Sequence, residues 1–452
     1  MALTPRRASR HNPIVTDTEI HADAPPDVEV LPDGAAIPAA PAAGGTGSGT
    51  AGAAAGGTAA ELAKGAPIPL AEMAAAAGLE RVHMIAWRDL DDPEAGGSEV
   101  HAAHIAAAWA AAGIDVTMRT SSAAGLPTFG TRDGYKTVRK SGRYTVFPRT
   151  AVSGALGRTG SGDGLVEIWN GMPFFSPLWS RCPSIVLLHH VHAEMWRMVL
   201  KPAALARLGE FVEFKLAPPV YRRSHILTLS SSSKAEIVEL LRIPADRIEV
   251  VPPGISPSFS PGGERSPHPL VLAVGRLVPV KRFHLLVAAL VALKERHPAL
   301  EAVIAGEGYE RPALEAQIGA AGAEDWLHLP GRIDDAQLLG LYRRAWVLAS
   351  TSLREGWGMT ITEAAACGTP AVVSDIAGHH DAVDPGRSGL LVDPHASAPL
   401  VDALDDVLRD DGLRARLGSG ALEHASRFTW EASARGTLEA LCAEAQRRRG
   451  RG

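Results

Sequence analysis

Short apolar runs alternate along the chain with longer segments in which hydrophobic residues recur at helical spacing. The first run, RVHMIAW at residues 81–87, precedes a predicted helix at 99–113 and a second apolar run, IDVTMRT, at 114–120. Ser98 is the expected N-cap of this helix and Gly113 its stop. A strand, a helix and a strand in this order form a βαβ unit, which predicts parallel pairing of the two strands.

The same alternation continues through the rest of the chain. In its first half, the further strand-like runs are LVEIWN, PSIVLLHH, HILTLSSSS and RIEVVPPGI. In its second half they are LVLAVGR, EAVIAGEG, WLHLPG, WVLAST, AVVSD and SGLLVD, with helical segments between them. This pattern predicts an α/β protein with doubly wound parallel sheets. The helix KAEIVELL is expected to begin with a capping box of Ser233 and Glu236.

Changes in composition divide the chain into segments. SPSFSPGGERSPHP, at residues 256–269, is rich in Pro, Gly and Ser and is the expected linker between two domains. The N-terminal stretch has few large apolar residues, which predicts a disordered low-complexity tail. A final helix with a basic tail is expected to pack back toward the first domain. The predicted ranges for the tail, the two domains and the C-terminal segment are 1–75, 76–260, 266–426 and 427–452.

The overall composition narrows the class of protein. A length of 452 residues suffices for two domains with substantial cores, and 46% hydrophobic with 21% charged residues is typical of globular chains. The formal net charge of -5 gives no electrostatic reason to expect nucleic acid binding. Three scattered cysteines, Cys182, Cys367 and Cys442, indicate neither a disulfide framework nor a zinc site.

No targeting or membrane-spanning segment is predicted. No apolar run is long enough to cross a bilayer, and the N-terminal arginines are not followed by the apolar core of a secretory signal. The cytoplasm is therefore the expected location. The C-terminal QRRRGRG is expected to be solvated, with at most a marginal peripheral contact to acidic lipid at the inner membrane face.

Residues 353–375, LREGWGMTITEAAACGTPAVVSD, are predicted to form a loop, a short helix and a buried strand. Strand ends and helix starts converge at such junctions, where open α/β sheets bind ligands. Gly356 and Gly358 allow close approach of the backbone to a ligand, and Glu355 and Glu363 flank the junction. Thr360 with Glu363 also has capping-box spacing, so a purely structural role for Glu363 stays open.

A second junction of this kind follows the first strand. Gly96 and Gly97 place bare backbone at a helix start, which suits an anion, although a tight turn alone would also use them. Asp89 and Asp91 form a short Asp-x-Asp pattern, for which a solvated loop is favoured over a metal-bound diphosphate.

Three histidines, His189, His190 and His192, crowd the end of the strand PSIVLLHH. An isolated histidine on an apolar strand is usually structural. Three at the carboxyl end of a parallel strand favour at least one functional histidine.

The ordered set of motifs resembles glycosyltransferase family 4, the retaining nucleotide-sugar transferases of the GT-B fold. The motifs are GGSE, the histidine after IVLL, SSSSK before RIEVVPPGI, GRLVPVK, GEG and EGWGMTITE, and they run from about Arg81 to the C-terminal helix. In the last motif, seven residues separate two glutamates, which is the spacing found in this family. VPPG departs from the VPNG of related sequences. The resemblance implies two Rossmann-like domains that face a cleft.

The resemblance also implies roles for residues. Arg276 and Lys281 correspond to the basic pair that grips the donor diphosphate, Glu363 to the ribose-binding carboxylate and Glu355 to the one that contacts the transferred sugar. His189 or His190 corresponds to the histidine across the cleft, and the spacing from Pro183 favours His189. The implied catalytic residues are His189, His190, Glu355, Arg276 and Lys281. The implied donor-binding residues are Gly96, Gly97, Arg276, Lys281, Arg332, Gly356, Trp357, Gly358, Met359, Thr360 and Glu363.

The implied activity is transfer of a sugar from a nucleotide-diphosphate sugar to a hydroxyl of a glycan, a lipid-linked molecule or a small molecule, with no metal and no other cofactor. Fixed cations suit this chemistry, because breaking the sugar–phosphate bond leaves negative charge on the diphosphate. A nucleotide-sugar epimerase and a non-catalytic sugar-binding homologue are the alternatives. An NAD-linked oxidoreductase is disfavoured, since AGEGYERP lacks the third glycine of the dinucleotide fingerprint.

Overall fold

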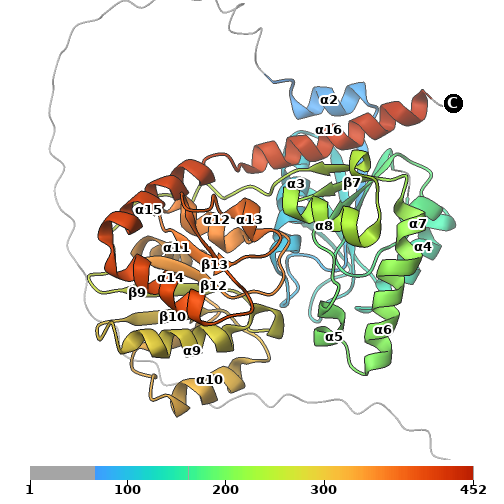
Figure 1. The fold of residues 1–452 in the computed structure, drawn as a ribbon. Coiled ribbons are helices and arrows are strands. Elements are labelled where there is room, and N and C mark those ends of the chain that lie inside the picture. The colour runs from blue at the N-terminus through green and yellow to red at the C-terminus, as the bar shows by residue number, and fades with distance from the viewer. Residues whose placement is uncertain (1–66, 161, 451–452) are drawn as a thin grey trace, which may run out of the picture. The chain divides into compact units, whose positions relative to one another are not determined.

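The first half of the chain forms an eight-stranded sheet in the order β3-β4-β2-β1-β5-β6-β7-β8 (Figure 1). The computed structural model describes residues 67–160 and 162–450. Every neighbouring pair of strands is parallel except β3 and β4. The strands are β1 (Arg81–Ile85), β2 (Asp115–Thr120), β3 (Phe129–Arg132), β4 (Tyr135–Arg139), β5 (Gly164–Trp169), β6 (Ser184–Leu188), β7 (His225–Thr228) and β8 (Ile248–Val250).

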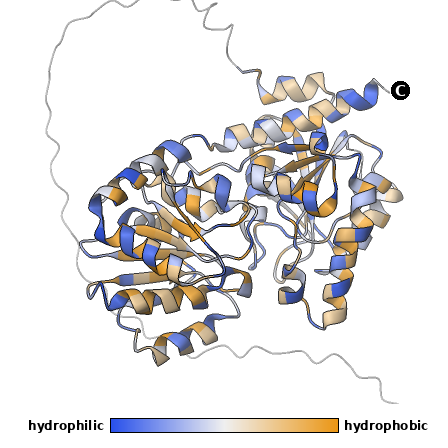
Figure 2. Cartoon of the chain, viewed as in Figure 1, coloured by the Kyte–Doolittle hydropathy of each residue, from blue (hydrophilic) through white to orange (hydrophobic). Residues whose placement is uncertain are grey.

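Central strands of this sheet are covered on both faces. Every residue of β5 and of β6 is buried, which explains why SIVLL reads as a continuous apolar run rather than an alternating one. In Figure 2 the strands are mostly hydrophobic, and the helices that surround them carry both hydrophobic and polar residues. The helices of this half are α2 (Leu70–Ala76), α3 (Gly97–Ala111), α4 (Val146–Ala155), α5 (Met195–Val199), α6 (Ala203–Phe211), α7 (Ala217–Tyr221) and α8 (Ser231–Leu241).

The second half forms a six-stranded, all-parallel sheet in the order β11-β10-β9-β12-β13-β14. Its strands are β9 (Leu270–Val274), β10 (Glu301–Ala305), β11 (Leu327–Gly331), β12 (Val347–Ser350), β13 (Ala371–Ser374) and β14 (Gly389–Val392). Its helices are α9 (Phe283–Lys294), α10 (Arg311–Ala320), α11 (Asp335–Arg344), α12 (Met359–Ala366), α13 (His379–Ala382), α14 (Ala398–Arg409) and α15 (Asp411–Ala425). The prediction of two doubly wound α/β sheets is confirmed, and we call the two halves the first and second lobes.

The last helix, α16 (Trp430–Arg449), returns to the first lobe. The Trp109 indole of α3 donates to the carbonyl of Ala434 at 2.9 Å, and His104 stacks on Trp430. The chain therefore crosses between the lobes twice, and the two crossings are paired. The Ile255 amide donates to the Phe428 carbonyl at 3.2 Å, and a β-bridge links Ile255 to Thr429. None of the helices in the described part of the chain has the length and apolar character needed to cross a membrane.

Several expected boundaries differ from the structure. The tail prediction for residues 1–66 lies outside the described residues, but α2 begins at Leu70, inside the predicted tail. Helix α3 has Gly96, not Ser98, as its N-cap, because the carboxylate of Glu99 accepts from the Gly96 amide. Helix α8 is capped by Ser230, whose hydroxyl accepts from the Ser233 amide at 3.0 Å. The predicted capping box of Ser233 and Glu236 is therefore wrong.

The hairpin of β3 and β4 was not predicted. Its turn is Asp133–Gly134, and both residues have positive φ, at 46° and 86°. An Asp-Gly pair between strands is the usual signal for a two-residue hairpin turn, so the sequence did contain the information.

Candidate functional site

Charged side chains gather where two central strands of the second lobe end. Strands β9 and β12 are neighbours in the sheet. Arg276 lies two residues beyond β9, and the loop that carries Glu355 follows β12. Parallel strands all end on the same side of the sheet, so these loops meet there. Helix α12 also begins there, with the amides of its first turn. We call this site, at the carboxyl ends of β9 and β12, the charged edge of the second sheet.

Lys281 and Glu355 form an ion pair at this edge. The carboxylate of Glu355 also accepts from the Ser352 hydroxyl at 2.8 Å. Burial alone would raise the pKa of Glu355, but the Lys281 ammonium, together with His379 and the Ser352 hydroxyl, outweighs it and lowers this pKa to about 2. The pair is partly accessible, with 19% of each side chain exposed, so a ligand can reach both charges.

Arg276 is an exposed cation. Among the described residues, none forms a hydrogen bond or an ion pair with its side chain. Close packing of glycine-rich loops sets its position: a Cβ on Gly306 would lie 1.9 Å from the Gly275 carbonyl, and one on Gly308 would lie 2.2 Å from that of Leu277. Only glycine at these two positions allows the loop that carries Arg276 to lie against the end of β10.

Glu363 is held by a residue that the sequence did not indicate. The hydroxyl of Tyr342, on α11, donates to the Glu363 carboxylate at 2.8 Å. Burial raises the pKa of Glu363 to about 7, although this hydrogen bond opposes the shift. Gly358 precedes α12 as its N-cap, so the capping-box role with Thr360 does not occur.

The first lobe approaches this edge through Gly96 and Gly97. A Cβ on Gly97 would lie 3.2 Å from the Met359 sulfur, and one on Gly96 would lie 3.7 Å from Nε of Arg276. Gly97 therefore lets the loop before α3 come close to Met359, whereas a Cβ on Gly96 would make only an ordinary contact with Arg276. The Gly96 amide is already bound by Glu99, so it is not a free donor for an anion. Arg332 also joins the lobes, since it donates to the Pro93 carbonyl.

The loop 353–358 packs closely on the first lobe. A Cβ on Gly356 would lie 2.4 Å from the His189 carbonyl oxygen, and the Ser233 hydroxyl donates to the Gly356 carbonyl at 3.3 Å. The Trp357 side chain is buried against Phe428, so its indole is part of the packing between the chain segments rather than an exposed group.

The two adjacent histidines at the end of β6 have different surroundings. His189 is buried, and its Nε2 lies 3.2 Å from Nδ1 of His101, whose other ring nitrogen lies 3.0 Å from the Ser433 hydroxyl of α16. His190 instead lies near enough to Glu355 and Arg276 for both charges to affect its pKa, which burial lowers to about 3. These surroundings favour His190, and not the spacing-preferred His189, as the histidine nearer the charged edge.

Two contacts between the lobes had no local signal in the sequence. Arg354 pairs with Glu194 at 3.1 Å and also with Glu236 of α8. The Asp381 carboxylate accepts from the Ser231 amide at 2.8 Å, at the start of α8. These partners are more than one hundred residues apart in sequence, and only the fold brings them together.

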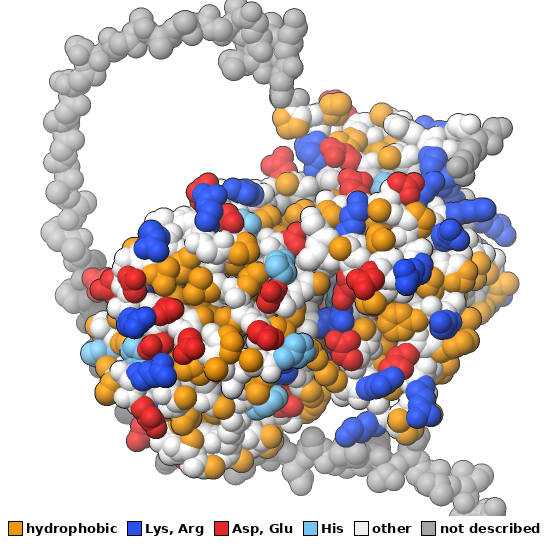
Figure 3. Space-filling view, in the orientation of Figure 1, with side chains coloured by type: hydrophobic (Ala, Val, Ile, Leu, Met, Phe, Trp, Pro, Cys, Tyr) orange, Lys and Arg blue, Asp and Glu red, His pale blue; other side chains and the backbone are white. Residues whose placement is uncertain are grey.

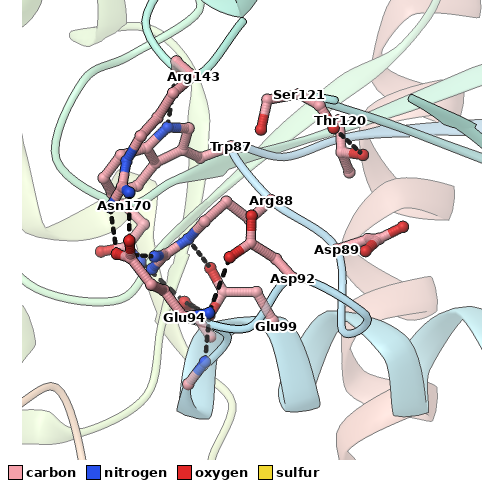
Figure 4. Close-up of polar contacts among 12 residues, drawn as sticks. Trp87, Arg88, Asp89, Asp92, Glu94, Glu99, Thr120, Ser121, Arg143 and Asn170 are labelled. Atoms are coloured by element: carbon pink, nitrogen blue, oxygen red, sulfur yellow. Dashed lines mark hydrogen bonds and ion pairs between the residues drawn. The ribbon is translucent and has the colours of Figure 1, made fainter. Parts of the chain in front are cut away.

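Charged side chains form a cluster around Trp87 on the first lobe (Figure 4). The guanidinium groups of Arg88 and Arg143 lie 4.4 Å and 5.1 Å from the Trp87 ring centre, and both pair with Glu94. The hydrogen bond from Arg143 contributes most to lowering the pKa of Glu94, and Arg276 contributes to the same shift. The cluster therefore lies near Arg276 and brings one aromatic and several charged groups to that side of the first lobe.

The Asp-x-Asp pattern has a structural role. Asp89 is buried and pairs with Arg139, which also binds Asp91 at 2.6 Å. The predicted solvated loop is therefore wrong for Asp89. Within residues 67–160 and 162–450, no group of three or more His, Cys, Asp or Glu side chains is arranged to hold a metal ion.

Two family models match adjacent parts of the chain. Residues 95–259 match Glycosyltransferase Family 4, and residues 257–424 match Glycosyl transferases group 1. A D-inositol 3-phosphate glycosyltransferase of Stackebrandtia nassauensis is 35% identical over 252 residues, which are 51% of this chain and 56% of that protein. The chain spans about half the length of this and several similar curated relatives.

Solved structures share the fold. Sucrose-phosphate synthase from Thermosynechococcus elongatus is similar with a TM-score of 0.68 and 21% identity, over 79% of this chain and 97% of that one. The structure of Alr3699/HepE from Anabaena with UDP-glucose is similar with a TM-score of 0.63 and 18% identity, over 80% of this chain and 99% of that one. Both likenesses extend across the two lobes.

Proposed function

The chain belongs to glycosyltransferase family 4, and from this we propose that it transfers a sugar from a nucleotide-diphosphate sugar to a hydroxyl acceptor. The observation that carries this proposal is the edge of the second sheet. There, the exposed Arg276, the Lys281–Glu355 pair and the start of α12 converge. Fixed cations and helix amides at one point are suited to a diphosphate.

In the proposed reaction, Arg276 and Lys281 bind the diphosphate and stabilise the negative charge that grows on it as the sugar–phosphate bond breaks. Glu355 binds the sugar being transferred, and the backbone of residues 356–359 donates to sugar hydroxyls and phosphate. Lys281 is already held by Glu355, so little reorganisation of this cation is needed when the charge develops. We propose that the anomeric configuration is retained, which NMR of the product would test.

His190 and Glu363 are proposed to position the donor. Burial lowers the pKa of His190 to about 3, so the ring is neutral near pH 7 and can both donate to and accept from a sugar hydroxyl. Glu363 is proposed to accept hydrogen bonds from the ribose. The Tyr342 hydroxyl already fixes the orientation of its carboxylate.

The acceptor is proposed to bind on the first lobe, beside the Trp87 cluster, since that cluster lies near Arg276. A glycan, a lipid-linked molecule and a small molecule all offer the required hydroxyl. Because several relatives are D-inositol 3-phosphate glycosyltransferases, that compound is the first acceptor to test. UDP-glucose, present in the HepE structure, is the first donor to test.

A panel of nucleotide sugars should first be screened by thermal shift, since a ligand that binds only the folded state raises Tm. The best donor should then be incubated with and without acceptors. Transfer to an acceptor supports the proposal. A donor sugar that is converted without any acceptor, or no nucleotide binding at all, would contradict it.

We predict that EDTA leaves the transfer rate unchanged, because protein cations are placed to carry the diphosphate charge. The measurement is the initial rate after dialysis against EDTA, with and without added Mn²⁺. A rate that EDTA abolishes and Mn²⁺ restores would show that a bound cation is required.

We predict that Gly356→Ala lowers kcat/KM on the order of 10²-fold, because its Cβ would meet the His189 carbonyl and shift the loop by about an ångström. Gly340→Ala is the matched control, since a Cβ there would meet nothing within 4 Å. Equal activity of the two variants would show that the close approach of Gly356 to β6 has no role in transfer.

A further inference from the structure

Four large hydrophobic side chains are exposed within one short stretch of the first lobe. They belong to α6 and to the π-helical turn η2 (Val212–Leu216) that continues it. Their exposed fractions are 48% for Leu205, 53% for Leu208, 50% for Phe211 and 44% for Leu216. Leu205, Leu208 and Phe211 are three residues apart and therefore lie on one side of the helix. We call these four residues the α6 face.

The α6 face is exposed because the opposite side of the helix is already packed. A Cβ on Gly209 would lie 2.5 Å from the Trp196 ring, so the helix cannot roll toward α5. Ala206 and Val212 are buried on the same inner side. The outward direction of the four apolar side chains is thus imposed by the packing of the lobe. In water, that exposure has a free-energy cost that a covering partner would remove.

The segment that carries the α6 face is also rich in exposed basic side chains. Between residues 201 and 223 the chain has five basic residues, all exposed, namely Lys201, Arg207, Lys215, Arg222 and Arg223. It has two acidic residues there: Glu213 is buried, and Glu210 is paired with Arg197 at 2.6 Å. This local excess of positive charge contrasts with the formal net charge of -5 for the whole chain. Figure 3 shows hydrophobic side chains among Lys and Arg in the part of the molecule where Figure 1 places α6.

We propose that the α6 face docks the protein on the surface of a bilayer that contains anionic phospholipid. Apolar side chains that enter the acyl boundary, with Lys and Arg at the level of the headgroups, are the combination that holds a helix in that interface. The charge selects this partner over a second copy of the chain, because two copies placed face to face would bring ten basic residues together. This docking site is distinct from the C-terminal basic tail.

The element that carries the α6 face is hydrogen-bonded to the segment that follows His190. Glu213, on the inner side of η2, accepts from the backbone amides of His192 and Ala193 at 2.7 Å and 2.9 Å. It also accepts from the Trp196 indole at 2.9 Å. The segment that carries His190 into the cleft is therefore bonded to the element that would rest on lipid. A membrane-borne acceptor would reach the cleft from this side, and that consequence alone rests on the proposed function.

The test is co-sedimentation of the full chain with vesicles of phosphatidylcholine alone and of phosphatidylcholine mixed with phosphatidylglycerol. The wild type should sediment with the mixed vesicles and lose this binding at high salt. Leu208→Ser with Phe211→Ser, and separately Arg207→Gln with Lys215→Gln, should each lower the partition coefficient about tenfold or more. Leu422→Ser with Arg416→Gln, on the exposed side of α15, is the matched control and should bind like the wild type.

Equal binding to both kinds of vesicle, or undiminished binding by either α6 variant, would overturn the proposal. So would sedimentation velocity that shows a wild-type dimer and a Leu208→Ser, Phe211→Ser monomer, since the face would then join two copies. A single cooperative melting transition checks that each variant is folded. Because neither readout uses catalysis, a failure of the proposed transfer activity would leave the vesicle result interpretable.

Discussion

Replacing Lys281 by alanine is expected to lower kcat/KM for sugar transfer on the order of 10²–10³-fold, the effect typical of removing one group that stabilises a developing negative charge. The loss has two physical parts. The departing diphosphate loses a cation, and the largely covered Glu355 carboxylate loses its counter-ion. The measurement is steady-state kinetics with saturating acceptor, together with calorimetric titration of the nucleoside diphosphate.

Lys281→Arg and Lys294→Ala are the controls for this prediction. Arginine keeps the charge but changes the geometry, so it should recover part of the activity. Lys294 is in the last turn of α9, where its ammonium donates to the Leu300 carbonyl at 2.8 Å, away from the charged edge. An alanine there should leave kcat/KM near that of the wild type. Full activity of Lys281→Ala would remove this lysine from the mechanism.

Glu363→Gln is expected to make the free protein more stable above pH 7 and to weaken its binding of the donor. In the folded chain burial raises the pKa of Glu363 to about 7 from an ordinary value of 4.5. Between these two values the folded state holds a proton that the unfolded state has released. The free energy of unfolding therefore falls as pH rises through this window, and the cost is complete above pH 7.

Glutamine removes that cost and can still accept from the Tyr342 hydroxyl. The expected gain above pH 7 is roughly 1–3 kcal/mol, with no gain near pH 4. Loss of a charge-assisted hydrogen bond to the ribose should weaken nucleotide binding by roughly 10- to 100-fold. Thermal melts at pH 4 and pH 8, with nucleotide titrations, measure both effects. The control is Glu295→Gln, which replaces a glutamate that is exposed and not buried. A variant that is stabilised equally at both pH values would contradict the proposed cause.

The local pattern of the sequence was enough to predict the edge of the second sheet. Arg276 and Glu355 follow apolar runs directly, and parallel strands must end together, so their proximity follows from topology. What local pattern cannot supply is the partner of a buried group. The hydrogen bond of Tyr342 with Glu363 and the contact of His101 with His189 link distant elements. The adjacent histidines His189 and His190 show a related limit, because two neighbouring side chains can have different surroundings that the local sequence does not distinguish.

The paired crossings between the lobes have a mechanical consequence. A Cβ on Gly254 would lie 2.1 Å from the Trp430 amide nitrogen, so the outgoing and returning segments touch at this point. Because both covalent connections lie at this one place, the lobes cannot separate there, and any opening between them would have to be a rotation about this point. A residue larger than glycine at position 254 would push the two segments apart and so disturb the connection between the lobes, although it lies outside the charged edge.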